Sequence, residues 1–147
     1  MCFLLYIASD ASLPDIAWDE LHPDLSTNAL SDYEIPIGEK LIGRNRKYVS
    51  SEQGCGCGYR SLTFQNGTWP DSASSGSTKP AIKGIAIHNS LYRFVKTALD
   101  QRYDVSLYGC WDGDFSEPKA GDSAILAEII CDSSFYFRER MLYKIKC

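Results

Sequence analysis

The first third of the chain contains one continuous apolar run, after which apolar residues become sparse. Residues 2–8 are apolar throughout and are followed at once by polar residues. Such a run predicts a strand in the middle of a sheet, covered on both faces. Between residues 10 and 45, prolines interrupt every helical period, which predicts a segment that wraps the core and includes a single short helical turn. Residues 47–51 predict a short strand.

The middle of the chain changes from a hairpin pattern to a polar loop and then to a helix. Residues 62–69 predict a hairpin around an Asn-Gly turn. Residues 71–79 are rich in serine and glycine, which predicts a mobile surface loop. The main helix is predicted at about residues 80–101, where proline suits the first turn and an apolar stripe follows. The stripe consists of Leu91, Val95, Ala98 and Leu99.

The last third of the chain returns to the patterns of strands. Residues 103–111 alternate between the two faces of a strand. Residues 123–130 start with a capping serine and predict a short helix, with a strand as the alternative. Two apolar segments, 135–137 and 141–145, flank a charged turn and predict a C-terminal β-hairpin.

These elements place strands at both ends of the chain around one helix, without regular alternation of strand and helix. The pattern predicts an α+β fold, with a mixed or mostly antiparallel sheet packed on one main helix at about 80–101 and a C-terminal β-hairpin. The chain has 147 residues, of which 44% are hydrophobic. That length and composition suit one hydrophobic core, so a single domain is expected over 1–147.

The net charge of the chain limits the kinds of partner that it is expected to bind. There are 15 lysines and arginines against 19 aspartates and glutamates, for a net charge of −4. A nucleic acid or an anionic membrane surface would require a basic face, so neither is expected as a partner. The N-terminal apolar run is too short to cross a bilayer and has no basic flank, so it predicts neither a membrane span nor a secretory signal. We therefore expect a cytoplasmic protein with reduced thiols.

The chemically distinctive segment is Gly-Cys-Gly-Cys-Gly at residues 54–58. Cys55 and Cys57 are close enough in sequence to ligate one soft ion, and the glycines let the backbone fold closely around it. A tetrahedral shell needs further ligands. Cys110 is the first choice, because it lies at the predicted end of a strand where loops gather, and Cys2 is the next. The sequence thus predicts a zinc or copper site formed by these four cysteines.

Two other interpretations of the same segment remain open. The paired thiols can form a redox switch, because nearby backbone amides lower a thiol pKa and a bridge between cysteines one residue apart would be strained and labile. Alternatively, the glycines form a sharp turn while the cysteines fill gaps in the core without chemistry.

Other reactive residues give no stronger pattern. A catalytic set of Cys55 or Cys57 with His88 and Asp112 is chemically reasonable, but nothing in the sequence brings these residues together, so no catalytic site is predicted. His88 is expected on the helix surface or as a cap, and His22 in a loop. Asp112 and its neighbours are typical of a turn.

Two functions are therefore expected. The first is a thiol-centred site at Cys55 and Cys57 that binds zinc or copper or responds to redox conditions. The alternative is a non-catalytic acidic protein, of the inhibitor or immunity type, that covers a basic surface of a protein partner.

Overall fold

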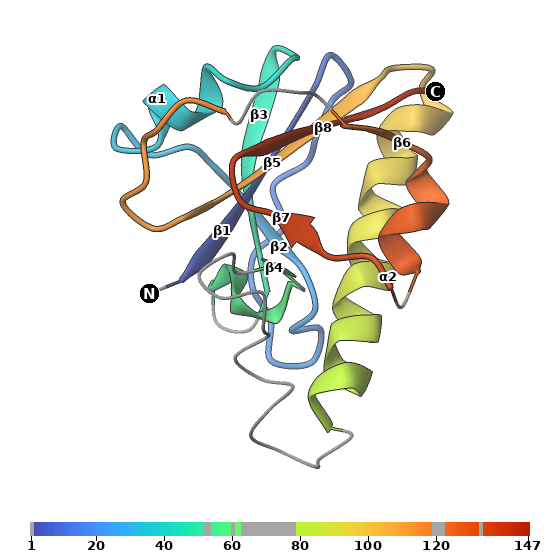
Figure 1. The fold of residues 1–147 in the computed structure, drawn as a ribbon. Coiled ribbons are helices and arrows are strands. Elements are labelled where there is room, and N and C mark those ends of the chain that lie inside the picture. Colours follow the sequence, from blue (N-terminus) through green and yellow to red (C-terminus); the bar gives the residue numbers. More distant parts are fainter. Residues whose placement is uncertain (1, 52–53, 60, 63–78, 119–122, 133) are drawn as a thin grey trace.

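A six-stranded mixed sheet forms the centre of the fold, in the order β2-β3-β1-β5-β8-β6 (Figure 1). The computed structural model describes residues 2–51, 54–59, 61–62, 79–118, 123–132 and 134–147. Neighbouring strands pair antiparallel except for β6, which runs parallel to β8. The sheet comprises β1 (Phe3–Ser9), β2 (Ser26–Ala29), β3 (Asn45–Ser50), β5 (Val105–Trp111), β6 (Ser123–Ile125) and β8 (Met141–Ile145). The predicted α+β class and mostly antiparallel sheet are confirmed.

Strand β1 is the central strand that the apolar run predicts. It lies between β3 and β5, and its residues from Leu5 to Ala8 are fully buried. Because side chains alternate along a strand, Leu5 and Ile7 join the core on one face, whereas Tyr6 and Ala8 join the core on the other. Both cores of the molecule therefore depend on β1.

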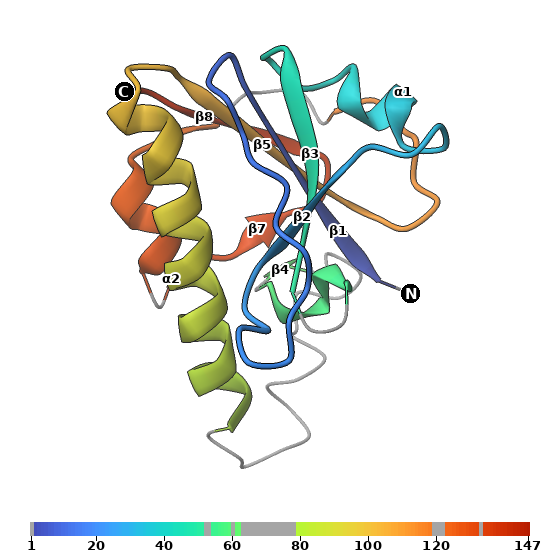
Figure 2. The ribbon, with the colours of Figure 1, turned by 180° about the vertical axis from the view of Figure 1, so that it is seen from behind.

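Helices cover the two faces of the sheet unequally (Figure 2). The long helix α2 (Lys79–Asp100) confirms the predicted main helix, and its stripe of Leu91, Val95 and Ala98 is buried against one face. The short helix α1 (Ile35–Gly38) lies over the other face, where Ile37 is buried with the tyrosines of β1 and β5. Among the described residues, no helix is long and apolar enough to cross a membrane.

Some elements differ from the predicted ones. The segment expected only to wrap the core contains β2, because Thr27 pairs with both Val49 and Ile16 and is fully buried. Residues 123–130 divide into β6 and a 3-10 helix, Ala127–Cys131, so both alternatives for this stretch occur in part. The predicted hairpin at 62–69 and the loop at 71–79 fall almost entirely outside the described residues.

The C-terminal strands have the expected hairpin-like arrangement. Strand β7 (Phe137–Arg138) ends at a turn, where Arg140 has a φ of 55°, and the chain then continues into β8. The ladder bonds of β7 are made to β4 (Ser61–Leu62), with which it runs parallel. This pairing joins two segments that are far apart in the sequence.

His88 is not at the helix surface, so that expectation was wrong. Its side chain has no exposed area, and its Nδ1 lies 2.8 Å from the carbonyl oxygen of Ile130. The ring centroids of Tyr59 and Phe137 lie 6.1 and 5.6 Å from that of His88. The imidazole thus ties α2 to the 3-10 helix through a hydrogen bond inside an aromatic cluster. His22 lies in an exposed loop, as expected, with its Nδ1 3.0 Å from Asp19.

Replacing His88 by alanine would leave a cavity and remove the partner of a buried carbonyl group. We expect His88→Ala to lower the free energy of unfolding by about 3 kcal/mol. The matched control is His22→Ala at the exposed histidine, for which a change within about 0.5 kcal/mol is expected. Urea denaturation of the three proteins measures both effects, and equal midpoint shifts for the two variants would contradict the role given to His88.

Candidate thiol-disulfide site

The loop that follows β3 folds back toward the start of β1 and is held by backbone hydrogen bonds. The Ser51 amide donates to the Cys55 carbonyl oxygen at 2.8 Å, and the Tyr59 amide donates to that of Gly56 at 3.2 Å. The Tyr48 hydroxyl donates to the Gly54 carbonyl oxygen, also at 3.2 Å. Residues Gly56–Gly58 between these bonds form a short 3-10 helix. The loop therefore has a defined backbone path.

Each glycine of this loop is favoured for a different steric reason. Gly54 has a φ of +82°, a left-handed conformation that favours glycine. Gly56 lies directly on β1, where a Cβ atom would overlap the carbonyl oxygen of Phe3. At Gly58 a Cβ atom would overlap the side chains of Ile87 and Ser51. Gly54 is thus favoured by its backbone conformation, Gly56 by a backbone contact and Gly58 by contacts with side chains.

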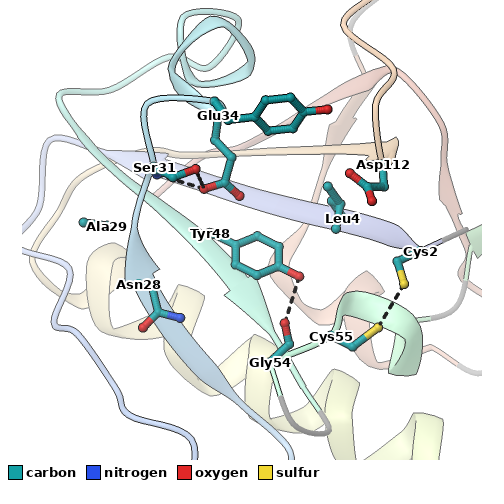
Figure 3. A pocket seen from close by; sticks show the side chains of 11 residues that line it. Cys2, Leu4, Asn28, Ala29, Ser31, Glu34, Tyr48, Gly54, Cys55 and Asp112 are labelled. Carbon is teal, nitrogen blue, oxygen red and sulfur yellow. Dashed lines mark hydrogen bonds between the residues drawn. The ribbon is translucent and has the colours of Figure 1, made fainter.

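This packing brings two cysteine sulfurs together at the start of β1. Cys2 precedes the strand, and its carbonyl oxygen accepts a 2.9 Å hydrogen bond from the Asp112 amide, which extends the ladder between β1 and β5. The Sγ atoms of Cys2 and Cys55 are 3.6 Å apart and point toward one another (Figure 3). Cys55 is disulfide-bonded, so the expectation of reduced thiols is wrong for this residue, whereas Cys2 is a free thiol. A free thiol therefore contacts a disulfide sulfur.

The other predicted ligands do not join this pair in the part of the chain that the structure describes. Cys110 is fully buried in the core around Tyr6 and Tyr108. Burial, and then the nearby carboxylates of Asp114 and Asp112, raise the pKa of the Cys110 thiol to about 12, so it stays protonated. The side chain of Cys57 lies outside the described residues.

A metal shell is not complete among the described residues. They contain no group of three or more histidine, cysteine, aspartate or glutamate side chains that could hold a metal ion. The zinc site thus stays a prediction. The hypothetical catalytic set is not assembled around His88 either, because its imidazole is buried in the aromatic cluster beside Ile130.

A pocket of about 510 Å³ opens beside the two sulfurs. It lies on the face of the sheet that carries α1, and its walls come from residues between 2 and 55 and from Asp112, which follows β5 (Figure 3). The lining residues are Cys2, Leu4, Asn28, Ala29, Ser31, Tyr33, Glu34, Tyr48, Gly54, Cys55 and Asp112. Since Cys2 and Cys55 belong to the lining, a small molecule in the pocket can reach them.

Glu34 is fixed in this wall by neutral donors. The amide and hydroxyl of Ser31 donate to its Oε2 at 2.9 and 2.8 Å, and the Tyr6 hydroxyl donates to Oε1 at 3.3 Å. Burial, and next the carboxylate of Glu34, raise the pKa of Tyr48 to about 12, so this phenol remains neutral and serves as a donor.

The charge of the pocket wall is negative. Glu34 and Asp112 are its acidic residues, and the described lining contains no lysine, arginine or histidine. Within the described part of the chain, neither carboxylate forms an ion pair. The pocket is therefore an anionic hollow beside a thiol.

Only part of this site is predictable from the sequence. Cys2 and Cys55 were candidates, and Asp112 was expected in a turn, which Gly113 completes with a φ of +81°. Glu34 and Tyr48 were not candidates. Alternation along β1 is a usable signal for the first side of the pocket, because it places Cys2, Leu4 and Tyr6 on one face. Tyr48 reaches the pocket from β3 because β3 lies beside β1. The pattern of apolar and polar residues does not specify this order of strands.

Comparisons of the chain with models of protein families, with curated proteins and with solved structures gave no match. The function is therefore argued from the geometry of the site.

Gly56→Ala tests the packing that brings the loop to β1. The added methyl group must displace backbone, so we expect a loss of about 2 kcal/mol in the free energy of unfolding. Gly54→Asn is the matched control, because asparagine tolerates a positive φ and a Cβ atom there meets nothing within 4 Å. Guanidinium denaturation measures both variants. Gly56→Ala as stable as Gly54→Asn would show that the close approach is unnecessary.

The burial of Cys110 predicts its reactivity. A rise in pKa from 9.0 to about 12 lowers its thiolate fraction at pH 8 by about a thousandfold. Iodoacetamide should therefore modify exposed Cys147 in the native protein while Cys110 remains protected, and the difference should disappear in guanidinium. Peptide mass spectrometry reads both sites. Equal modification of Cys110 in native and unfolded protein would contradict its placement in the core.

Proposed function

We propose that this chain carries a redox-sensitive site in which the Cys2 thiol and the disulfide of Cys55 undergo exchange. The observation that carries the proposal is the 3.6 Å distance between a free thiol sulfur and a disulfide sulfur. Thiol–disulfide exchange starts with attack of a thiolate on a disulfide sulfur, so the two reacting atoms are already neighbours.

The exchange step conserves atoms and electrons. The Cys2 thiolate attacks Cys55 Sγ, and a bond forms between these sulfurs as the bond from Cys55 to its present partner breaks. The released cysteine leaves as a thiolate and takes up a proton, equal to the one that Cys2 gave up. No net oxidation occurs, and the disulfide moves from one cysteine pair to another. We propose Cys57 as the leaving cysteine, because it is separated from Cys55 by one residue.

The accessibility of the two thiols to small molecules supports a role in exchange for Cys2 rather than for Cys110. Cys2 is half-buried and lines the pocket, so its sulfur can meet a small reductant or oxidant. Cys110 is held protonated in the core. Zinc or copper binding at Cys55 would require prior reduction, because metal ligation uses thiolates. Metal binding is therefore proposed only as a property of the reduced protein.

The alternative function, contact of an acidic protein with a basic partner, has no specific observation in its favour. Many of the described carboxylates form ion pairs with basic side chains, which lowers their attraction for an external cation. These pairs are Asp10–Arg44, Asp15–Lys47, Asp100–Lys96, Asp104–Lys146, Asp114–Arg140 and Glu117–Lys40.

Disulfide mapping tests the exchange. Protein equilibrated in glutathione buffers of graded ratio is quenched with N-ethylmaleimide, digested without reductant and analysed by mass spectrometry. We expect two linkages of Cys55, one of them to Cys2. Their ratio should stay constant while the total linked fraction falls as the buffer becomes more reducing, because exchange between them involves no net oxidation. Cys57→Ser should convert all linked protein to the Cys2–Cys55 form.

The controls separate exchange from random oxidation. Cys2→Ser should retain a single linkage of Cys55, and Cys147→Ser, which removes an exposed free thiol, should behave like the unmodified protein. The proposal fails if Cys2 is alkylated completely at every glutathione ratio, both in the unmodified protein and in Cys57→Ser.

A further inference from the structure

We infer that the exchange partner of this site is a small disulfide or thiol that carries a positively charged amino group. The inference rests on the proposed exchange function and adds the chemical class of the substrate. It comes from the walls of the pocket, in which the reactive sulfurs, two carboxylates and two tyrosines surround one hollow (Figure 3).

The carboxylates supply the charge preference. Glu34 accepts hydrogen bonds from Ser31 and Tyr6, which are neutral donors, and no described basic side chain forms an ion pair with it. Asp112 is exposed at the mouth of the pocket, next to Cys2. A hollow lined by charge of one sign raises the local concentration of the opposite ion and repels ions of the same sign. An ammonium group is therefore attracted, and a carboxylate is repelled.

The tyrosine rings supply a second contact for a cation. Tyr48 packs against Tyr6 with ring centroids 5.5 Å apart, and Tyr33 packs against Phe115 at 4.8 Å. These neighbours hold the rings in place, and an aromatic face attracts an ammonium group. Because Tyr48 stays neutral and donates to Gly54, it adds no further negative charge.

The size of the hollow suits a small molecule. Pockets of about 300–1,000 Å³ are typical of small-ligand sites, and this one has about 510 Å³. Figure 3 shows the carboxylate of Asp112 above the Cys2 sulfur and Glu34 across the hollow from it. A compact aminothiol disulfide can place its sulfur at Cys2 while its ammonium group faces these carboxylates.

The reaction with such a disulfide is balanced. The Cys2 thiolate attacks one sulfur of R–S–S–R, and a mixed disulfide forms between Cys2 and one half of the reagent. The other half leaves as a thiolate and is protonated by water. The ammonium group takes no part in bond changes and serves only to position the reagent.

Three disulfides of different charge test the inference. Cystamine is cationic, bis(2-hydroxyethyl) disulfide is neutral and 3,3′-dithiodipropionate is anionic. The rate of adduct formation at Cys2 is measured by mass spectrometry, and each rate is divided by that of the same reagent with N-acetylcysteine. We expect normalised rates roughly tenfold higher for cystamine than for the neutral reagent, a lower rate for the anion, and convergence of all three at high salt.

Variants locate the source of the preference. Glu34→Gln and Asp112→Asn should each reduce the advantage of cystamine, and the double variant should remove it. Asp100→Asn is the matched control, because Asp100 lies on α2 and pairs with Lys96 outside the pocket. It should keep the full advantage.

The outcomes distinguish the two proposals. Equal normalised rates for the three reagents, or a cystamine preference that survives the double variant, would overturn the charge selectivity while leaving the exchange intact. Failure of every reagent to form an adduct at Cys2 would instead contradict the exchange function itself.

Discussion

The contact of the Gly56 backbone with the Phe3 backbone is the constraint on which the site depends. No side chain separates these two segments, so the loop at 54–58 lies directly on the start of β1. Because β1 is one of the two central strands of the sheet and is buried from Leu5 to Ala8, the position of Cys55 is tied to the buried centre of the fold. Cys2 precedes the same strand, and the close contact of the two sulfurs follows from this arrangement.

The two faces of β1 contribute to different properties of the protein, one to its stability and the other to the pocket. On the α2 face, Leu5 and Ile7 contribute to an aliphatic and aromatic core whose role is stability. On the α1 face, the buried tyrosines of β1 and β5 have pKa values raised mainly by burial, so they remain neutral. The pocket opens on this second face, where neutral phenols and the carboxylates of Glu34 and Asp112 lie near the sulfurs. The chemistry of the site therefore depends on polar residues that the fold holds in fixed protonation states.

Local patterns predicted the elements that are dominated by burial. The continuous run of β1, the stripe of α2 and the alternation of β5 each specify a single structure, because an apolar face must be covered. Strand β2 was missed because its sequence, Ser-Thr-Asn-Ala, has no apolar periodicity and it pairs through β3. The pairing of β4 with β7 was missed because it joins distant segments and leaves no local signal.

The two cysteines of the site were candidates from the sequence, but the residues that surround them in the pocket were not. The glycine and cysteine spacing identified Cys55, whereas the predicted strand end favoured Cys110 over Cys2 as the next ligand. Position along a strand does not say whether a thiol faces the core or a pocket edge, and Cys110 faces the core. Glu34 reaches the pocket from the segment between β2 and α1, and such tertiary placement has no signature in one sequence.

Carbon-13 spectra of protein labelled at cysteine Cβ test the contact between Cys2 and Cys55 without a chemical trap, because the Cβ shift separates thiols from disulfides. If the two sulfurs exchange, Cys55 gives a disulfide shift and Cys2 a thiol shift with a second, disulfide-bonded population, and that population changes with the poise of the buffer. A Cys2 resonance that stays in the thiol range at every poise at which Cys55 is oxidised would contradict the exchange.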